Sequence, residues 1–401
     1  MCGVYLRPVV FFGLLWTENI SMTLDSDSEK LAIHLDCRFF IGEKPCIFKT
    51  LCHSCKNYSP MGFRILIIKL GAMGDVLRTT PLLPALKNRY RESYVTWITD
   101  SVSLELLQLN PYIDRLLTFS YESILRLEGE KFDLMICLDK EPRASALAMK
   151  MQADNKQGFG LSKYGNVFSL NKESDYAFML GIDDNKKFKE NKKSYQEIIF
   201  EIAGLKYHNE EYVLNTSHSS REYAKSLFDK IGIKESDRVI GVSPGAGSVF
   251  ANKAWTIEGY IDLIDKINNH GDGNIKIVLL GGRAEIKINK IINENVKGHV
   301  FDSGCENSLS QYIAIVDRCH VIVSGDTLAM HLGIGLKKQV LAIFGPTCPQ
   351  EIELYGRGEK VVSAFDCAPC YKNRCDLQYN CMTVISTGEV YEKTMRLLSR
   401  L

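Results

Sequence analysis

The chain has 401 residues, of which 45% are hydrophobic and 24% are charged. This length is too great for one small module, and the composition is not that of a disordered protein, so two similar domains are expected. The 49 basic residues nearly balance the 48 acidic ones, which gives a formal net charge of +1. Wholesale electrostatic attachment to nucleic acid or anionic lipid is therefore excluded, and any anion site must be local.

Residues 1–61 are predicted to form an extension ahead of the folded domains. The apolar run from Val9 to Trp16 is too short to span a bilayer, and its flanks lack the pattern of a secretory signal. Residues 1–30 are predicted to be an irregular leader, with Met22 as an alternative start. These features predict a cytoplasmic protein. The extension also carries the first of two cysteine clusters.

Residues 62–210 show the strand, loop and helix alternation of a parallel sheet. The run 64–70 is almost continuously apolar and ends at Gly71, which is typical of a strand buried on both faces. A helical stretch follows through Tyr90, with Thr80-Pro81 as a second helix start. Further strands are expected at 94–99 and 132–138, with helices at 101–109, 121–128 and 142–152. The pattern predicts a Rossmann-like domain.

The same alternation returns in residues 211–385. The pattern loosens between 171 and 220, so the crossing between the domains is expected near 205–220. Strands are expected at 239–243, 276–280, 321–324 and 340–344, each followed by glycine and a helical stretch. The predicted fold class is α/β, with two tandem doubly wound domains. The closing helix, within 386–401, has an apolar stripe and is expected to pack back on the first domain.

The glycine-rich loop after the first strand ends in Asp75, within Gly71-Ala-Met-Gly-Asp. Such a loop normally cradles a phosphate, because free N–H groups and the helix dipole favour an anion. Here a carboxylate occupies that place and would repel a phosphate, so Asp75 is predicted to be a general base. The simpler interpretation is that Asp75 caps the helix, and the two roles are compatible.

The second domain has small residues and a lysine at its strand ends. Ligands bind outside the carboxyl ends of parallel strands, small residues admit a phosphate, and lysine supplies a point charge. A helix expected over 327–336 would direct its free N–H groups at a diphosphate. For the histidine of that helix, the simpler interpretation is a packed residue. The residues predicted to bind a nucleotide diphosphate are Gly245, Gly247, Ser248, Lys253, Gly281, Asp326, Thr327, Ala329 and His331.

Four segments carry a family resemblance: 65–86 with its LGAMGD loop, 243–247 with Lys253-Ala-Trp255, 323–331, and 344–346. Over about residues 63–400, the chain resembles family 9 glycosyltransferases, the lipopolysaccharide heptosyltransferases. The resemblance implies a GT-B fold with the active site in the cleft, and an inverting reaction without a metal ion. It also implies that Asp75 is the base. The sequence departs from the family at Leu328, where glycine is usual.

The mechanism that the resemblance implies is direct displacement at the anomeric carbon of the donor sugar. Asp75 would take the proton of the acceptor hydroxyl, while Lys253 and the helix start at Thr327 would stabilise the leaving diphosphate. An anionic acceptor would be held by basic side chains of the first domain, although each of them can equally be a solvated surface charge. The residues predicted to bind the acceptor are Lys69, Gly74, Arg78 and Arg143, the last within the segment 139–143.

Eight cysteines fall into two clusters of four. The clusters are Cys37, Cys46, Cys52 and Cys55 in the extension, and Cys367, Cys370, Cys375 and Cys381 before the closing helix. Four thiols in a loop-like stretch indicate a structural metal, with tetrathiolate zinc as the first choice and an iron–sulfur cluster as the second. Packed free cysteines are the alternative, because the spacings are irregular.

The sequence therefore predicts an inverting glycosyltransferase that moves a sugar, with heptose from ADP-heptose as the leading donor. The expected acceptor is a lipopolysaccharide-core or other lipid-linked or cell-surface glycan precursor, met through peripheral contact with the inner face of the inner membrane. No cofactor for catalysis and no nucleic-acid partner are expected. One alternative keeps the fold and uses another nucleotide sugar. The other is a non-catalytic, metal-stabilised nucleotide-binding scaffold.

Overall fold

The computed structural model describes residues 33–245 and 251–401, which form two compact units divided after Gly62. The predicted leader, Gly247 and Ser248 lie outside the described residues. The first unit, described over 33–62, has one short 3-10 helix, η1 (Cys52–Ser54), and an isolated antiparallel bridge between Cys37 and Pro60. The second unit contains both predicted sheets.

The first sheet has the strand order β3-β2-β1-β4-β5-β6 among the described residues. Its pairs are parallel except for β5 with β6. The strands are β1 (Phe63–Ile68), β2 (Ser93–Thr99), β3 (Arg115–Thr118), β4 (Lys131–Cys137), β5 (Gln152–Leu161) and β6 (Val167–Ser169). Ile65 and Ile67 of β1 face one apolar cluster, while Leu66 and Ile68 face another. The central strand is therefore buried on both faces, as predicted from its continuous apolar run.

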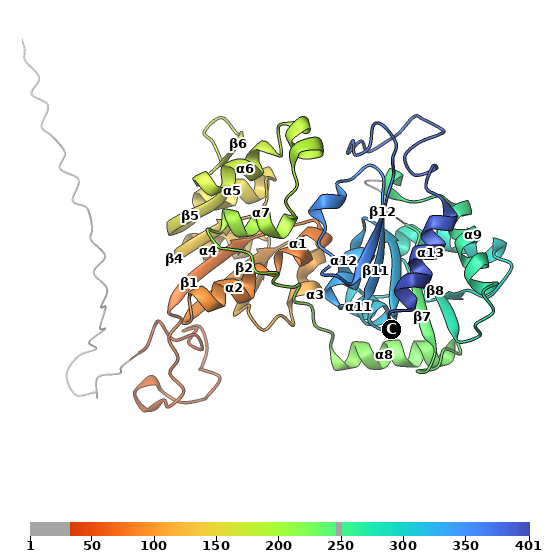
Figure 1. Cartoon of the computed structure of the whole chain (residues 1–401). Helices are drawn as coiled ribbons and strands as arrows, with labels where there is room; N and C mark the ends of the chain where they lie inside the picture. Colours follow the sequence, from red (N-terminus) through yellow and green to blue (C-terminus); the bar gives the residue numbers. More distant parts are fainter. Residues whose placement is uncertain (1–32, 246–250) are drawn as a thin grey trace, which may run out of the picture. The chain divides into compact units, whose positions relative to one another are not determined.

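Helices cover both faces of this sheet and complete the first lobe, residues 63–202. They are α1 (Met73–Thr79), α2 (Leu82–Arg89), α3 (Leu104–Leu107), α4 (Tyr121–Glu128), α5 (Pro142–Lys150), α6 (Asp175–Met179) and α7 (Tyr195–Ile202). Helix α7 packs on α1, α2 and α6 (Figure 1). The lysine-rich stretch before α7 forms a short π-helical turn, η4 (Lys186–Glu190).

The second sheet is parallel throughout its described strands, with the order β12-β11-β10-β7-β8-β9. The strands are β7 (Arg238–Ser243), β8 (Ile275–Leu279), β9 (Phe301–Asp302), β10 (Val321–Gly325), β11 (Gln339–Phe344) and β12 (Gly358–Val362). The order changes direction between β10 and β7, so the loops after these two strands flank a crevice of the kind that binds ligands in doubly wound sheets.

Helices of the second lobe, residues 218–401, cover this sheet. They are α8 (His218–Lys230), α9 (Ile257–Asn268), α10 (Ile286–Asn295), α11 (Leu309–Asp317), α12 (Leu328–Gly335) and α13 (Thr387–Leu398). None of the described helices is long and apolar enough to cross a membrane. The lobes meet where α1 packs on α12 and α3 packs on α11.

The closing helix differs from its prediction. Helix α13 packs on α9 and on strands β10, β11 and β12 of the second sheet, rather than on the first domain (Figure 1). Its buried residues Val390, Leu397 and Leu398 join the cluster that contains Leu341 and Val361. The apolar stripe is a packing face, as predicted. It packs on the second sheet because the strands that precede it in the chain, β10 to β12, offer the nearest apolar surface.

Candidate functional site

Asp75 lies in the first turn of α1, directly beyond the carboxyl end of β1. The residue at the N-cap position is Ala72, which makes no side-chain capping hydrogen bond. Asp75 therefore does not cap the helix, and its carboxylate instead forms an ion pair with Arg78, with Oδ1 2.9 Å from Nη2. The side chain of Asp75 is 37% exposed, so the carboxylate remains accessible while the ion pair holds it in place.

Arg78 is fixed by groups from three segments. Its guanidinium lies 3.8 Å from the ring centre of Tyr195 of α7, and Nη1 lies 3.9 Å from Oε2 of Glu351, in the second lobe. The Arg78 backbone carbonyl also accepts a hydrogen bond from Gln196. Because two carboxylates share its charge, Arg78 is well suited to orient Asp75. Neither Tyr195 nor Glu351 was among the residues predicted from the sequence.

The electrostatic surroundings keep Asp75 ionised. Burial alone would raise the pKa of Asp75, but the charges of Arg78 and Lys69, with smaller contributions from His331 and Lys253, lower it to about 2. Lys253 belongs to the second lobe, so a cation of the predicted donor site also lowers the pKa of Asp75. The group is therefore a carboxylate throughout the neutral range.

Gly74 and His331 form the contact between α1 and α12. A Cβ atom on Gly74 would lie 2.5 Å from Cδ2 of His331, so only glycine allows this approach. His331 is 5% exposed, and its Nδ1 lies 3.4 Å from the Tyr212 hydroxyl. Burial lowers the pKa of His331 to about 4, which leaves the imidazole neutral at pH 7. The structure thus gives Gly74 a contact with the second lobe and His331 the packed position of the simpler interpretation.

The start of α12 lies at the sheet's change of direction, beyond β10. Lys253, in the 3-10 turn η5 (Ala251–Lys253), has Nζ 3.2 Å from Oδ2 of Asp326. Thr327 occupies the N-cap position without a side-chain capping bond, and its hydroxyl lies 2.8 Å from that of Ser324. A helix start beside a lysine is a favourable place for an anion, because N–H groups and a positive charge converge there. Ala329 is buried in the first turn of the helix.

The glycines after β7 and β8 both face Glu285. A Cβ atom on Gly245 would meet the Glu285 side chain at 2.2 Å, and one on Gly281 would meet it at 2.7 Å. The Glu285 carboxylate accepts a hydrogen bond of 2.9 Å from the Gly282 N–H. The two predicted glycines therefore lie on either side of one acidic side chain, which the sequence interpretation did not include.

The predicted acceptor residues Lys69 and Arg143 are both matched with carboxylates. Lys69 is only 3% exposed and is paired with Asp139, and it also donates to the Gly71 carbonyl. Arg143 is half exposed and is paired with both Asp100 and Glu141. The buried Lys69 contributes positive charge behind the site rather than a surface for contact.

Lys140 differs from these two cations, and the sequence interpretation named it only as part of a segment. Its Nζ donates to the Ala177 carbonyl at 2.8 Å and lies 5.5 Å from the ring centre of Phe159. Burial, with repulsion from Lys187 and Lys69, lowers the pKa of Lys140 to about 8, and the attraction of Glu351 opposes this shift only in part. An ammonium with this surplus of positive charge around it would gain from an anionic ligand.

Comparison with known proteins identifies the family of the chain. The profile described as glycosyltransferase family 9 (heptosyltransferase) matches residues 122–380, more than half of the chain. The chain belongs to this family. It is 21% identical over 312 residues to the lipopolysaccharide core heptosyltransferase OpsX of Haemophilus influenzae, which covers 75% of this chain and 84% of OpsX. The protein is therefore a glycosyltransferase.

Solved structures show the fold of this family 9 glycosyltransferase. A family 9 glycosyl transferase from Veillonella parvula superimposes with a TM-score of 0.66 at 20% identity, covering 85% of this chain and 99% of that one. The E. coli ADP-heptose lps heptosyltransferase II gives a TM-score of 0.60 at 17% identity, covering 84% and 99%. The two Rossmann-like lobes thus form a GT-B fold, as the resemblance implied.

No disulfide joins the described cysteines of this family 9 member. Within 33–245 and 251–401, no group of three or more His, Cys, Asp or Glu side chains is arranged to hold a metal ion. In the C-terminal loop, burial and the nearby charges of Cys370, Cys367 and Cys375 raise the pKa of the Cys381 thiol to about 11. These four thiols are therefore neighbours, although they are not in ligand positions.

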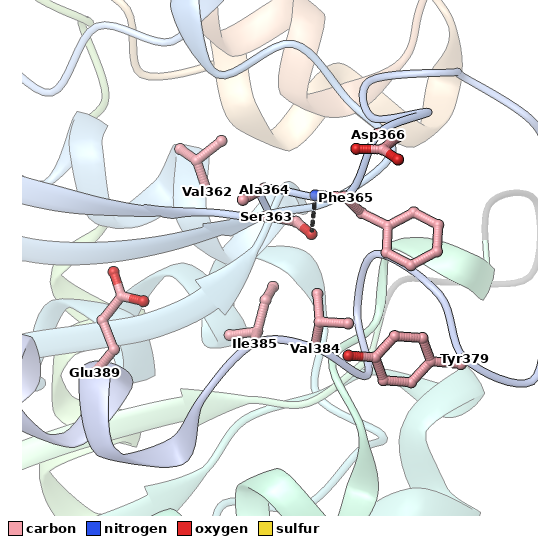
Figure 2. Close-up of a pocket in the computed structure, with 9 residues that line it drawn as sticks. All are labelled: Val362, Ser363, Ala364, Phe365, Asp366, Tyr379, Val384, Ile385 and Glu389. Atoms are coloured by element: carbon pink, nitrogen blue, oxygen red, sulfur yellow. Dashed lines mark hydrogen bonds between the residues drawn. The ribbon is translucent and has the colours of Figure 1, made fainter.

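A separate cavity of about 390 Å³ lies at the end of β12 in this glycosyltransferase. Figure 2 shows its lining, in which the Phe365 N–H donates to the Ser363 hydroxyl. The lining residues are Val362, Ser363, Ala364, Phe365, Asp366, Tyr379, Val384, Ile385 and Glu389. None of the predicted donor or acceptor residues is among them, so this cavity is distinct from the site around Asp75.

Proposed function

We propose that the protein transfers a heptose from ADP-heptose, with inversion, to an anionic lipopolysaccharide-core acceptor at the cytoplasmic face of a membrane. The observation that carries the proposal is the meeting of two helix starts from different lobes. One holds the Asp75 carboxylate, and the other, at Thr327, lies beside Lys253. The names of the similar proteins, OpsX and the E. coli ADP-heptose enzyme, support the choice of donor and acceptor.

In the proposed reaction, Asp75 accepts the proton of the acceptor hydroxyl. The oxygen lone pair forms a bond to the anomeric carbon of the heptose, and the bond from that carbon to the diphosphate oxygen breaks. The electron pair of the broken bond leaves with ADP. Lys253 and the N–H groups at the start of α12 stabilise the negative charge that develops on the diphosphate.

Donor binding would also make Asp75 a stronger base. In the free protein, neighbouring cations hold the pKa of Asp75 at about 2, which is low for a group that must accept a proton. A bound diphosphate brings negative charge to Lys253, one of those cations, and so opposes their effect. The carboxylate therefore becomes more basic when the sugar to be transferred is present.

For the acceptor, we infer that Lys140 and Lys187 contact its anionic groups. Both ammonium groups belong to the first lobe, and the ammonium of Lys187 lies 3.9 Å from the ring centre of Tyr371 of the second lobe. Lys69 and Arg143, by contrast, already have carboxylate partners. A phosphate or carboxylate on the acceptor would relieve the repulsion between Lys140 and Lys187.

The test is transfer by the purified full-length protein from ADP-heptose, compared with ADP-glucose, UDP-sugars and GDP-sugars. Two acceptors are compared, a lipopolysaccharide core with its phosphates and carboxylates and a core stripped of phosphate. ADP-heptose should be the preferred donor, and NMR of the product should show the opposite anomeric configuration to the donor. Preference for another nucleotide sugar would overturn the donor assignment. Donor binding without transfer or hydrolysis would favour the non-catalytic scaffold.

We also propose that Cys367, Cys370, Cys375 and Cys381 bind one structural metal ion, zinc in preference to iron. The four thiols belong to one loop, between β12 and α13, and Cys381 is buried beside Gly345, which follows β11. Four thiolates are a usual zinc-binding set. Elemental analysis of a Cys375→Ser variant should show loss of one metal ion per chain, and an unchanged metal content would return these residues to packed thiols.

A further inference from the structure

The first unit folds with almost no apolar interior. Across its described residues, 33–62, Cys37 is the single residue that is less than 9% exposed. Its large apolar side chains remain in water, among them Leu35 at 67% and Ile47 at 66% exposed. Burial of apolar area stabilises a fold by about 25 cal/mol per Å², so this unit has little hydrophobic stabilisation. Domains of this size usually need disulfides or a metal ion.

All four cysteines of this unit line one small cavity. The cavity has a volume of about 10 Å³, which is the room for a single water-sized sphere. Aromatic rings cover it, and two of them, Phe39 and Phe48, meet edge to face at 5.1 Å between centres. The thiols that share the lining are Cys37, Cys46, Cys52 and Cys55, and all are reduced. A space of this size suits one ion and is too small for an organic ligand.

Tight turns hold the cysteines around the cavity. The carbonyl of Cys37 accepts from Phe40 N at 3.0 Å, that of Cys46 from Lys49 N at 2.8 Å, and that of Cys52 from Cys55 N at 3.1 Å. Cys37, Cys46 and Cys52 therefore each begin a turn, and Cys55 ends the turn that Cys52 begins. All four side chains line the cavity. These bonds are local, so they place the thiols without help from a core.

Two further features favour a metal site with four cysteine ligands here. The Asn57 N–H donates to Sγ of Cys55 at 3.3 Å, which fixes the position of this sulfur beside the cavity. The segment 33–62 carries four Lys and Arg residues against two Asp and Glu residues, which is a formal charge of +2. Four thiolates with one divalent cation carry a net charge of −2, so the segment would be electrically balanced.

We propose that Cys37, Cys46, Cys52 and Cys55 bind one zinc ion, which replaces the missing core of the first unit. Binding would convert four thiols to thiolates, release four protons to the solvent and form four Zn–S bonds, with no change of oxidation state. Within residues 33–62 the four sulfurs do not already have the geometry of metal ligands, so binding would draw them together. This inference does not depend on the proposed glycosyl transfer.

The experiment measures zinc by elemental analysis in the full chain purified under reducing conditions. Cys46→Ser and Cys52→Ser should each lose one zinc per chain. Cys319→Ala removes a buried thiol of the second lobe and should lose none. Cys375→Ser identifies any metal held by the C-terminal loop, so the two clusters are counted separately. Unchanged zinc in both Cys46→Ser and Cys52→Ser would overturn the proposal.

A second measurement covers variants that fail to fold. Unmodified protein is treated with a strong chelator, and reactive thiols are counted before and after with a thiol reagent. Four additional thiols should react within residues 33–62, mapped by mass spectrometry, and proteases should then cut this segment faster. Reconstitution with cobalt should give the intense visible bands of a tetrahedral thiolate site. Thiols that react equally before chelation, or disulfides in the protein as purified, would overturn the proposal.

Discussion

The starts of α1 and α12 are similar backbone arrangements, and each carries an ion pair, Asp75 with Arg78 in α1 and Lys253 with Asp326 beside α12. Each follows a central parallel strand, and the two helices are in contact where the lobes meet. In α1, a carboxylate already lies in the first turn, held by Arg78. In α12, the first turn has no acidic residue, and a lysine lies beside it. In the proposed mechanism, one kind of helix start therefore holds the base in the first lobe and receives the leaving group in the second.

The largest effect is expected from removing the base at α1. Asp75→Asn keeps an oxygen near Arg78 but cannot accept a proton, so the rate should fall by about 10²–10⁴-fold, the usual contribution of a general base. Donor affinity, measured by calorimetry, should change little. Asp154→Asn is the control, since that carboxylate is half exposed in the same lobe. Near-normal turnover by Asp75→Asn would show that the start of α1 does not supply the general base.

The second expected effect concerns the imidazole between the two helix starts. The pKa of His331 is about 4 in the folded protein against an ordinary 6.5, so the unfolded chain binds more protons between these values. Stability should therefore fall as the pH decreases from about 6.5 to 4, by up to about 3 kcal/mol at 1.36 kcal/mol per pH unit.

Thermal unfolding across this pH range would measure the contribution of His331. His331→Gln should have a flatter profile than the unmodified protein, because glutamine does not titrate. The difference between the two curves isolates this residue from the other groups that titrate in the same range. Parallel curves would mean that His331 is protonated in the folded protein and that the α1–α12 contact includes a charge.

A smaller loss is expected from removing the cation at α12. Lys253→Ala should weaken donor binding by about 1.5–3 kcal/mol, the range for a hydrogen bond to a charged group. The loss should appear in calorimetry with ADP alone, and it should decrease at high salt. Lys290→Ala, an exposed lysine of α10, provides the matched control. If ADP bound equally well to both variants, the α12 start would not be the leaving-group site.

The smallest effect is expected for the acceptor. Lys140→Met keeps the aliphatic stem and removes the charge, so the KM for a phosphorylated acceptor should rise about fivefold, or about 1 kcal/mol for a partly exposed ion contact. The KM for a dephosphorylated acceptor should change less. Lys172→Met, at an exposed position of the same lobe, should leave both values unchanged. An equal rise for both acceptors would assign Lys140 a structural role.

The sequence predicted those elements whose signals are local. Strands β1, β7 and β10 were predicted correctly because their central positions are continuously apolar. Asp75 stands out because it follows a glycine-rich turn, and its role as a base stays a prediction. Edge strand β12 was missed, since its sequence Gly-Glu-Lys-Val-Val is half polar. The N-cap interpretation of Asp75 failed for a local reason too, because Ala72 begins the helix three residues earlier.

The rest of the site could not be read from the sequence because tertiary packing brings it together. Glu351 is 273 positions after Arg78 in the chain, and Tyr195 comes from a third segment. Neither residue lies in a recognisable motif, so the sequence does not distinguish either one from an ordinary surface or core residue. A sequence can therefore indicate a charged group without indicating the neighbouring residues that set its pKa.

The contact between Gly74 and His331 also bears on the order in which substrates act. The ring of His331 touches the turn of α1 immediately before Asp75, with no intervening side chain. If α12 moved when a diphosphate bound, the His331 ring would press on the turn of α1 and displace Asp75 with it. The donor would thereby set the position of the base before the acceptor hydroxyl arrives. In the proposed mechanism, the absence of a side chain on Gly74 would therefore favour binding of the donor before the acceptor.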